Sequence, residues 1–235
     1  MKKLSIIIPA YNEERSISQI LGKIHQTRLI GETEKEILII DDSSKDSTAE
    51  KCRQFMQAHP DLDIHYHLQP FNQGKGAALR TGIALATGDW IIIQDADLEY
   101  DPEDYNPLLQ WVIENNAKVV YGSRFLKPSN KHSYLRFYLG GRLVTFVTNL
   151  LYGQHLTDEP TCYKFFDAQF LKSIPLKCQG FEFCPEVTAK VCKKGIKIHE
   201  IPINYYPRSI AEGKKINWKD GLEAIWTLLK YRFKN

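Results

Sequence analysis

Short apolar runs alternate with amphipathic segments through the first half of the chain. Five runs of β-branched and other apolar residues have the length of buried strands, namely 4–8, 37–40, 64–68, 90–94 and 117–121. Four intervening segments have the length and pattern of helices, namely 13–25, 47–58, 76–86 and 102–115. Strands that alternate with helices of this length predict an α/β fold, in which helices cover both faces of a mostly parallel sheet.

Polar clusters directly follow three of these predicted strands, at 9–13, 41–44 and 95–99. The carboxyl ends of parallel strands meet at one edge of a sheet, and ligands of open α/β sheets bind outside that edge. We therefore expect the functional site there, built from residues that are far apart in the sequence.

Asp95 and Asp97 carry the sharpest chemical signal in the chain. Side chains two positions apart in an extended segment point the same way, so both carboxylates can face one point. A divalent cation relieves their repulsion, and hard oxygen ligands favour Mg²⁺ or Mn²⁺, with Glu99 as a third ligand. The alternative is a solvated acidic turn in which Asp97 or Asp101 caps the next helix. The neighbouring polar clusters favour the metal site.

The second half of the chain is basic and amphipathic. No Asp or Glu occurs from 115 to 157, and apolar residues recur there at helical spacing, as they do again near the C-terminus. The first set is Leu135, Leu139, Leu143, Phe146, Val147 and Leu150; the second is Ile216, Trp218, Leu222, Ile225, Trp226, Leu229 and Phe233. Such helices either lie in the headgroup region of an anionic membrane or pack their apolar faces on the sheet or a partner subunit.

Composition narrows the class of protein. The 235 residues are 43% apolar with a net charge of only +3, which predicts one globular domain and disfavours disorder and a nucleic-acid partner. Pro9 stops the opening apolar run too early for a signal peptide, and the longest uncharged stretch, 143–157, is shorter than the roughly 20 residues of a membrane span. Five cysteines without zinc-like spacing predict reduced thiols. We expect a cytoplasmic protein, peripheral on the cytoplasmic face of a membrane, attached by itself or through a membrane-protein partner.

Four motifs, in order, resemble those of family 2 glycosyltransferases with the GT-A fold. They are Pro-Ala-Tyr-Asn-Glu at 9–13, Ile-Asp-Asp-Ser-Ser-Lys-Asp-Ser-Thr at 40–48, Asn-Gln-Gly-Lys-Gly at 72–76 and Asp-Ala-Asp at 95–97. Gly-Ser-Arg-Phe at 122–125, Tyr-Pro-Arg at 206–208 and Glu-Gly-Lys-Lys at 212–215 are similar to the dolichyl-phosphate (polyprenyl-phosphate) mannosyltransferase branch. The resemblance implies a single GT-A domain over 1–235, with a nucleotide-sugar-binding half at 1–123 and an acceptor-side, membrane-proximal half at 124–235.

The resemblance also implies roles for individual residues. The nucleoside would be held by Pro9, Tyr11, Glu13, Ile40 and Asp42. The metal and the diphosphate would be held by Asp95, Ala96 and Asp97, with Arg124 beside the donor and with Arg208 and Lys214 closing over the phosphates. The catalytic groups would be Asp97, Arg124 and Arg208. Glu99 stands where mannosyl members commonly have Gln, and a carboxylate there can still ligate a metal.

Four other residues each have two interpretations. Lys75 either contacts phosphate or only sets the geometry at the start of a predicted helix. Asp41 is expected to hydrogen-bond the backbone of its turn rather than the donor. Glu182 and Glu186 lie where related transferases place acceptor-side groups, or they cap a helix that starts after Pro185.

The predicted reaction is a single inverting displacement that moves a hexose from a nucleotide sugar to a polyprenyl phosphate. A lipid phosphate is already an anion at neutral pH, so it needs no general base. GDP-mannose is the favoured donor, with UDP-glucose next. Transfer to a sugar hydroxyl in cell-surface polysaccharide synthesis is the alternative, with Asp97 as the base. A nucleotide-sugar-binding module without turnover is a third interpretation.

Overall fold

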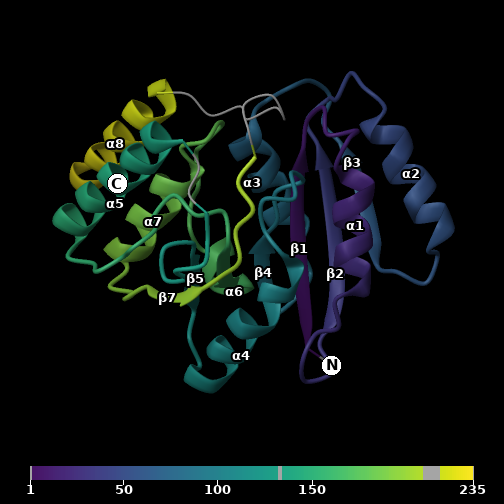
Figure 1. The fold of residues 1–235 in the computed structure, drawn as a ribbon, viewed down its shortest axis with the longest axis horizontal. Coiled ribbons are helices and arrows are strands. Elements are labelled where there is room, and N and C mark those ends of the chain that lie inside the picture. Colours follow the sequence, from purple (N-terminus) through teal and green to yellow (C-terminus); the bar gives the residue numbers. More distant parts are fainter. Residues whose placement is uncertain (1, 132–133, 209–217, 235) are drawn as a thin grey trace.

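The computed structural model describes residues 2–131, 134–208 and 218–234. A seven-stranded sheet runs through the centre in the order β3-β2-β1-β4-β6-β5-β7 (Figure 1). Five strands lie where the hydrophobic pattern predicts them: β1 Lys3–Ala10, β2 Glu34–Asp41, β3 Ile64–Leu68, β4 Trp90–Ile93 and β5 Val119–Ser123. Neighbouring strands pair in parallel except where β6 takes part, so the predicted mostly parallel α/β sheet is confirmed.

Helices cover both faces of the sheet (Figure 1). α1 Ile17–Gln26 and α2 Thr48–Ala58 lie on one face and α3 Lys75–Leu85 on the other, as right-handed crossovers in opposite directions along the sheet require. The short η1 Pro102–Asp104 and α4 Tyr105–Asn115 occupy the fourth predicted helical segment. α3 lies close to β1 because Gly82 has no side chain: a Cβ there would lie 2.4 Å from Cγ2 of Ile7.

The first helix begins four residues later than the pattern predicts. Asn12 has a positive φ of 53°, and the next residues form a turn in which the Glu13 carbonyl accepts the Ile17 amide. The Glu13 amide donates to the Thr48 hydroxyl at 2.8 Å, so the loops after β1 and β2 hold each other. Asp46, two residues before the start of α2, accepts the Thr48 amide at 3.0 Å.

The second half contains two strands that the pattern does not predict, β6 Lys164–Asp167 and β7 His199–Pro202. β6 is antiparallel to both β4 and β5, and its apolar core is only two phenylalanines long, too short for a periodic signal. α6 Ala168–Lys172 follows β6 directly. α7 Phe183–Lys193 starts before Pro185 rather than after it, because a proline in the first turn sacrifices no helical hydrogen bond.

Strands from both halves share this one sheet, since β6 lies between β4 and β5. The predicted division of one domain at residue 123 into donor and acceptor halves therefore follows no break in the sheet. It stays a prediction about function.

α5 Leu135–Tyr152 and α8 Trp218–Phe233 confirm the two amphipathic helices. They lie side by side with α7 at one end of the molecule (Figure 1), around a small apolar cluster that includes Val144, Leu228 and Tyr231. The Tyr152 hydroxyl donates to the Leu228 carbonyl at 2.7 Å. The two helices therefore bury one face against each other and against α7.

The opposite faces of these two helices are open. The first set consists of Leu135, Leu139, Leu143, Phe146 and Leu150, which we call the α5 stripe, and the second of Trp218, Leu222, Trp226, Leu229 and Phe233, the α8 stripe. Side chains of the α5 stripe are 52–72% exposed, so they do not pack on the sheet. Ile216, from the predicted set, lies outside the described residues. No helix within 2–131, 134–208 and 218–234 is long and apolar enough to span a membrane.

Gly76 offers a direct test of how α3 packs. A Cβ at Gly76 would lie 2.8 Å from the carbonyl oxygen of Gly180 and 2.9 Å from the carbonyl carbon of Gln179, and backbone atoms cannot turn aside. We expect Gly76→Ala to lower the free energy of unfolding by ~1–3 kcal/mol, measured by urea unfolding. The control is Gly22→Ala on α1, where a Cβ meets nothing within 4 Å and where ~0.5–1 kcal/mol should be gained. Equal stability of the two variants would contradict this packing.

Candidate functional site

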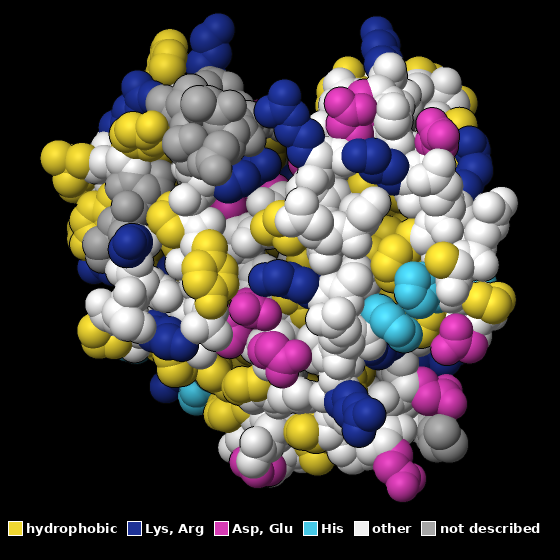
Figure 2. Space-filling view, turned by 45° about the vertical axis from the view of Figure 1, so that its right-hand side comes forward, with side chains coloured by type: hydrophobic (Ala, Val, Ile, Leu, Met, Phe, Trp, Pro, Cys, Tyr) yellow, Lys and Arg dark blue, Asp and Glu magenta, His cyan; other side chains and the backbone are white. Residues whose placement is uncertain are grey.

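A cavity of about 900 Å³, which we call the cleft, opens at the carboxyl ends of β1, β2 and β4. Ten predicted site residues line it: Pro9, Tyr11, Glu13, Asp42, Asp95, Ala96, Asp97, Glu99, Arg124 and Arg208. Figure 2 shows acidic and basic side chains lying together near the middle of one face of the molecule. The Ile40 side chain is instead fully buried in the core, next to Gly82 of α3. Lys214 lies outside the described residues.

Asp41 and Asp42, at the end of β2, shape the loops beside the cleft. Asp41 accepts the Ser44 amide at 2.8 Å, which is the predicted hydrogen bond within its turn. Asp42 accepts the amides of Gln73 and Gly74, both at 2.7 Å. Both carboxylates therefore bind backbone, and Asp42 in addition forms part of the cleft wall.

The N-terminus of α3 is covered by protein backbone. The Ala77 amide donates to the Gln179 carbonyl at 3.1 Å, and Gly74 and Gly76 permit this close approach. Lys75 reaches past this contact and donates to Asp95 at 2.5 Å. In this structure, the partner of the Lys75 side chain is therefore an aspartate of the strand-end turn, which neither of the two interpretations includes.

Glu182 and Glu186 hold the loop that covers α3. Glu182 accepts the amides of Gln179 and Gly180 at 2.7 and 2.8 Å. Glu186 accepts the Cys178 amide at 2.6 Å and forms an ion pair with Lys190. Burial by itself would raise the pKa of Glu186, but these contacts outweigh burial and the pKa is lowered. Neither glutamate caps α7 with its side chain. Their observed partners are therefore structural.

Asp95 and Asp97 lie in one buried turn directly after β4, each beside a cation. Burial opposes the ionisation of Asp95, but the Lys75 ammonium outweighs it and the pKa of Asp95 is lowered. Asp97 accepts from the Arg208 guanidinium at 2.6 Å. Burial, followed by the charges of Asp95 and Glu99, nevertheless raises the pKa of Asp97 to about 7. Three carboxylates, including that of Glu99, thus face two cations at this turn, which leaves one negative charge in excess.

Glu99, the predicted third metal ligand, has other partners. One carboxylate oxygen accepts the Arg208 amide at 2.8 Å and the other accepts the Tyr205 hydroxyl at 3.2 Å. Across 2–131, 134–208 and 218–234, the three acids of this turn do not form a group with ligand atoms within 4.8 Å of one another. The excess charge and the hard oxygens of Asp95 and Asp97 still fit a divalent cation such as Mg²⁺ or Mn²⁺, so two of the three predicted ligands suit it.

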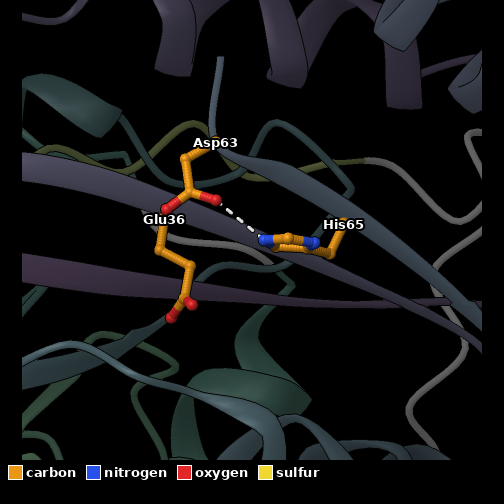
Figure 3. Close-up of side chains that lie close together, drawn as sticks. All are labelled: Glu36, Asp63 and His65. Carbon is orange, nitrogen blue, oxygen red and sulfur yellow. Dashed lines mark hydrogen bonds and ion pairs between the residues drawn. The ribbon is translucent and has the colours of Figure 1, made fainter.

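In the described part of the chain, the ligand atoms of one group do lie within 4.8 Å of one another, and that group is away from the cleft. It consists of Glu36, Asp63 and His65, near the start of β2 and β3 (Figure 3). Glu36 accepts from the Ser5 hydroxyl and from the Thr87 amide and hydroxyl at 2.5–2.8 Å. Asp63 binds His65 at 2.7 Å, and Lys3 at 2.9 Å. Because protein donors already bind these carboxylates, we interpret the group as a local hydrogen-bond network and not as a cation site.

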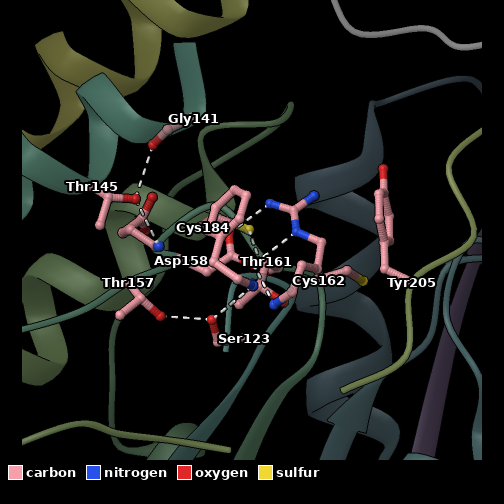
Figure 4. A network of polar contacts seen from close by, with 12 residues as sticks. Ser123, Gly141, Thr145, Thr157, Asp158, Thr161, Cys162, Cys184 and Tyr205 are labelled. Atoms are coloured by element: carbon pink, nitrogen blue, oxygen red, sulfur yellow. Dashed lines mark hydrogen bonds and ion pairs between the residues drawn. The ribbon is translucent and has the colours of Figure 1, made fainter. Parts of the chain in front are cut away.

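Arg124 is fixed at the far side of the cleft by Asp158, which the sequence does not single out. Nε and Nη2 of Arg124 donate to the two oxygens of Asp158, both at 2.7 Å, and Asp158 is fully buried. The ring of Tyr205 faces the guanidinium, with Cζ 5.1 Å from the ring centroid. Figure 4 shows Asp158 and Tyr205 within this network, where Ser123 bonds Thr157 at 2.6 Å. The only sequence signal for Asp158 is that it is the first acid after 115–157.

Known proteins resemble this chain in sequence. The dolichyl-phosphate β-glucosyltransferase of Trichomonas vaginalis is 29% identical over 97% of this chain and 72% of its own length. The UDP-N-acetylglucosamine–dolichyl-phosphate N-acetylglucosaminyltransferase of Methanococcus voltae is 28% identical over 92% of this chain and 91% of its own. A dolichyl-phosphate β-glucosyltransferase of Dictyostelium discoideum is 28% identical over 98% and 74%, respectively. A polyprenyl-phosphate branch therefore fits, as predicted.

Solved structures resemble it in fold. Glucosyl-3-phosphoglycerate synthase of Mycobacterium tuberculosis, crystallised with Mn²⁺, UDP and glucosyl-3-phosphoglycerate, superposes with a TM-score of 0.68 at 17% identity, over 98% of this chain and 80% of that one. Its complex with Mg²⁺ and UDP gives 0.69 at 16% identity, over 98% and 79%. These neighbours are GT-A glycosyltransferases, and the predicted GT-A fold is confirmed. The glycosyl transferase family 2 model matches residues 5–174, well over half of the sequence, and this chain therefore belongs to that family.

Proposed function

We propose that this enzyme transfers a hexose from a uridine-diphosphate sugar to a polyprenyl phosphate at a membrane surface. The observation that carries the proposal is the extent of the cleft. Its lining runs from Asp95 and Asp97 to the N-terminal ends of α5 and α8, where the two open apolar stripes begin. A single ligand that is charged at one end and apolar at the other matches such a cavity.

Glycines keep the helical end of the cleft wide. Gly140 on α5 and Gly221 on α8 both line it, and a Cβ at either position would meet nothing within 4 Å. The walls beside them are apolar and include Phe137, Val144 and Ile225. Space of this kind suits the first isoprene units of an acceptor, because apolar surface is removed from water on both sides.

The two stripes support attachment to a membrane. Both repeat large apolar side chains at successive helical turns, and Trp218, Trp226 and Phe146 are among the most exposed. Exposed basic residues flank them, including Arg136, Arg142, Lys219, Lys230 and Arg232. An apolar face bordered by basic side chains is typical of helices that lie at an anionic lipid surface. The cytoplasmic face is the side that we propose, in keeping with the sequence prediction.

The donor is proposed from the relatives. Two are named for glucose and one for UDP-N-acetylglucosamine, so we favour UDP-glucose or UDP-N-acetylglucosamine. None of these three is named for mannose, and GDP-mannose stays a prediction of the sequence. Asp95 and Asp97 would hold Mg²⁺ or Mn²⁺, which supplies charge neutralisation for the leaving diphosphate. Arg208, which donates to Asp97 at 2.6 Å, would take up charge of the diphosphate.

The proposed chemistry is an inverting displacement by the acceptor phosphate. The lipid phosphate arrives as an anion, so the chain has to position it rather than deprotonate it. Arg124, oriented by Asp158 on one side, is the cation that we assign to the acceptor side of the cleft. The pKa of Asp97, about 7, would suit a general base for a sugar hydroxyl, which is the alternative acceptor. The apolar end of the cleft favours the lipid.

Asp97→Asn tests the reaction centre. We expect transfer of labelled sugar to a polyprenyl phosphate to fall by about 10²-fold or more, because the amide holds a divalent cation poorly. The assay measures label in the organic phase with Mn²⁺ or Mg²⁺ and with UDP-glucose, UDP-N-acetylglucosamine and GDP-mannose in parallel. Asp61→Asn, at an exposed aspartate before β3, is the control. Full activity of Asp97→Asn, or label that enters only water-soluble acceptors, would contradict the proposal.

Phe146→Glu and Trp226→Glu test the membrane surface, one on each stripe. Each replaces a side chain that is more than 60% exposed, so the fold should stand. We expect about tenfold weaker co-sedimentation with phosphatidylcholine–phosphatidylglycerol vesicles for each variant, because the burial of one large apolar side chain is lost. Ile113→Glu on α4, where the side chain is 49% exposed, should bind vesicles like the wild type. Equal loss in all three variants would contradict a dedicated surface.

Gly140→Leu and Gly221→Leu test the acceptor end of the cleft. Leucine fills open space there, so we expect KM for a long-chain polyprenyl phosphate to rise about tenfold, with UDP binding unchanged. Gly22→Leu, at another open helical glycine, is the matched control. Unchanged KM in both cleft variants would place the lipid elsewhere.

A further inference from the structure

We propose that Glu99 is a positioning residue that holds the segment Tyr205–Arg208 across the cleft, an arrangement that we call the clamp. Its position in the Asp95–Glu99 turn suggests a metal ligand, and the clamp replaces that role. The proposal rests on the proposed function only for the identity of the ligand, a nucleoside diphosphate with its cation. Through this clamp, the Glu99 carboxylate determines the positions of the two arginines of the cleft, Arg124 and Arg208.

Both oxygens of Glu99 are used in the clamp. One accepts the backbone amide of Arg208 at 2.8 Å, and the other accepts the hydroxyl of Tyr205 at 3.2 Å. The Glu99 carbonyl also accepts the Tyr206 amide at 2.9 Å, and Tyr100 forms a β-bridge with Tyr205. The turn after β4 therefore binds residues more than 100 positions away through side chain and backbone alike.

Tyr205 carries the effect of the clamp to Arg124. Its hydroxyl is held by Glu99, and its ring lies 5.1 Å from Cζ of Arg124. A guanidinium over an aromatic face is attracted by the ring. The N–H groups of the Arg124 guanidinium are in turn held by Asp158. Arg124 is thus fixed from two directions, one of which depends on Glu99.

Arg208 is held by its backbone while its side chain meets Asp97 at 2.6 Å. A cation bound at Asp95 and Asp97 would compete with this guanidinium for the same carboxylate. Because Glu99 holds the Arg208 amide, the guanidinium can pass from Asp97 to a diphosphate oxygen while the backbone stays in place. If Glu99 turned to ligate the cation, the buried Tyr205 hydroxyl and the Arg208 amide would both lose their acceptor.

Hydrogen exchange tests the clamp without any ligand. In Glu99→Ala, we expect faster exchange of the Arg208 amide than in the wild type, whereas the Tyr206 amide keeps its acceptor, the backbone carbonyl of residue 99. Glu99→Gln should restore protection of Arg208, since its amide oxygen still accepts a hydrogen bond. The Asn204 amide, which donates to Asp104 at 2.7 Å, is the internal control and should keep its wild-type rate. Unchanged exchange of the Arg208 amide in Glu99→Ala would overturn the proposal.

A double-mutant cycle separates a positioning residue from a metal ligand. The readout is UDP affinity by calorimetry in the presence of Mn²⁺, for Glu99→Ala, Arg208→Ala and the double variant. A residue that acts through Arg208 weakens UDP binding by about tenfold alone and adds little to Arg208→Ala. Losses that multiply in the double variant would identify Glu99 as a ligand and overturn the proposal. If the wild type binds no UDP, the proposal of a uridine-diphosphate donor is wrong. The hydrogen-exchange rates would still show whether Glu99 holds the segment Tyr205–Arg208.

Discussion

The cleft depends on the pairing of buried carboxylates with cations that come from distant parts of the chain. A buried carboxylate without a partner is costly, and the turn after β4 holds two aspartates that repel each other. Lys75 pairs with Asp95 and Arg208 with Asp97, which balances most of this charge. Glu99 is a third carboxylate of the same turn, so one negative charge remains in excess of the two cations. That remainder is the physical reason why a divalent cation suits the site.

The same constraint builds the walls of the cleft. Asp42, Glu182 and Glu186 direct their carboxylates at backbone amides of loops, and Glu200 does so for the amides of Thr157 and Asp158. These bonds fix the loops around the cleft, and they supply acceptors to amides that would otherwise be buried without a partner, such as that of Cys178. Many of the acidic residues around the cleft therefore hold its loops in place and need not take part in the reaction. Their number near the site is a poor guide to which of them react.

At the other end of the cleft, the open apolar faces of α5 and α8 are the counterpart of this charged centre. Exposed apolar surface of this kind on neighbouring helices marks an interaction site rather than a solvated wall. Because both helices also line the cleft at their N-terminal ends, whatever covers the stripes lies at its mouth. Under the proposed function, a lipid surface and an acceptor with a lipid tail would satisfy both ends at once, which would link the location of the enzyme to its choice of acceptor.

The sequence by itself determined the local features: the five strands of the first half, the polar strand ends, the Asp95–Asp97 pair and the helical periodicity of α5 and α8. These follow from contacts between near neighbours along one strand or helix. Only the tertiary structure decided the antiparallel strand β6, the pairing of Arg124 with Asp158 and the contact of Glu99 with Tyr205. The last two join residues 34 and 106 positions apart. Which carboxylate meets which cation depends on strand order and loop path, and periodicity along the chain carries no information about either.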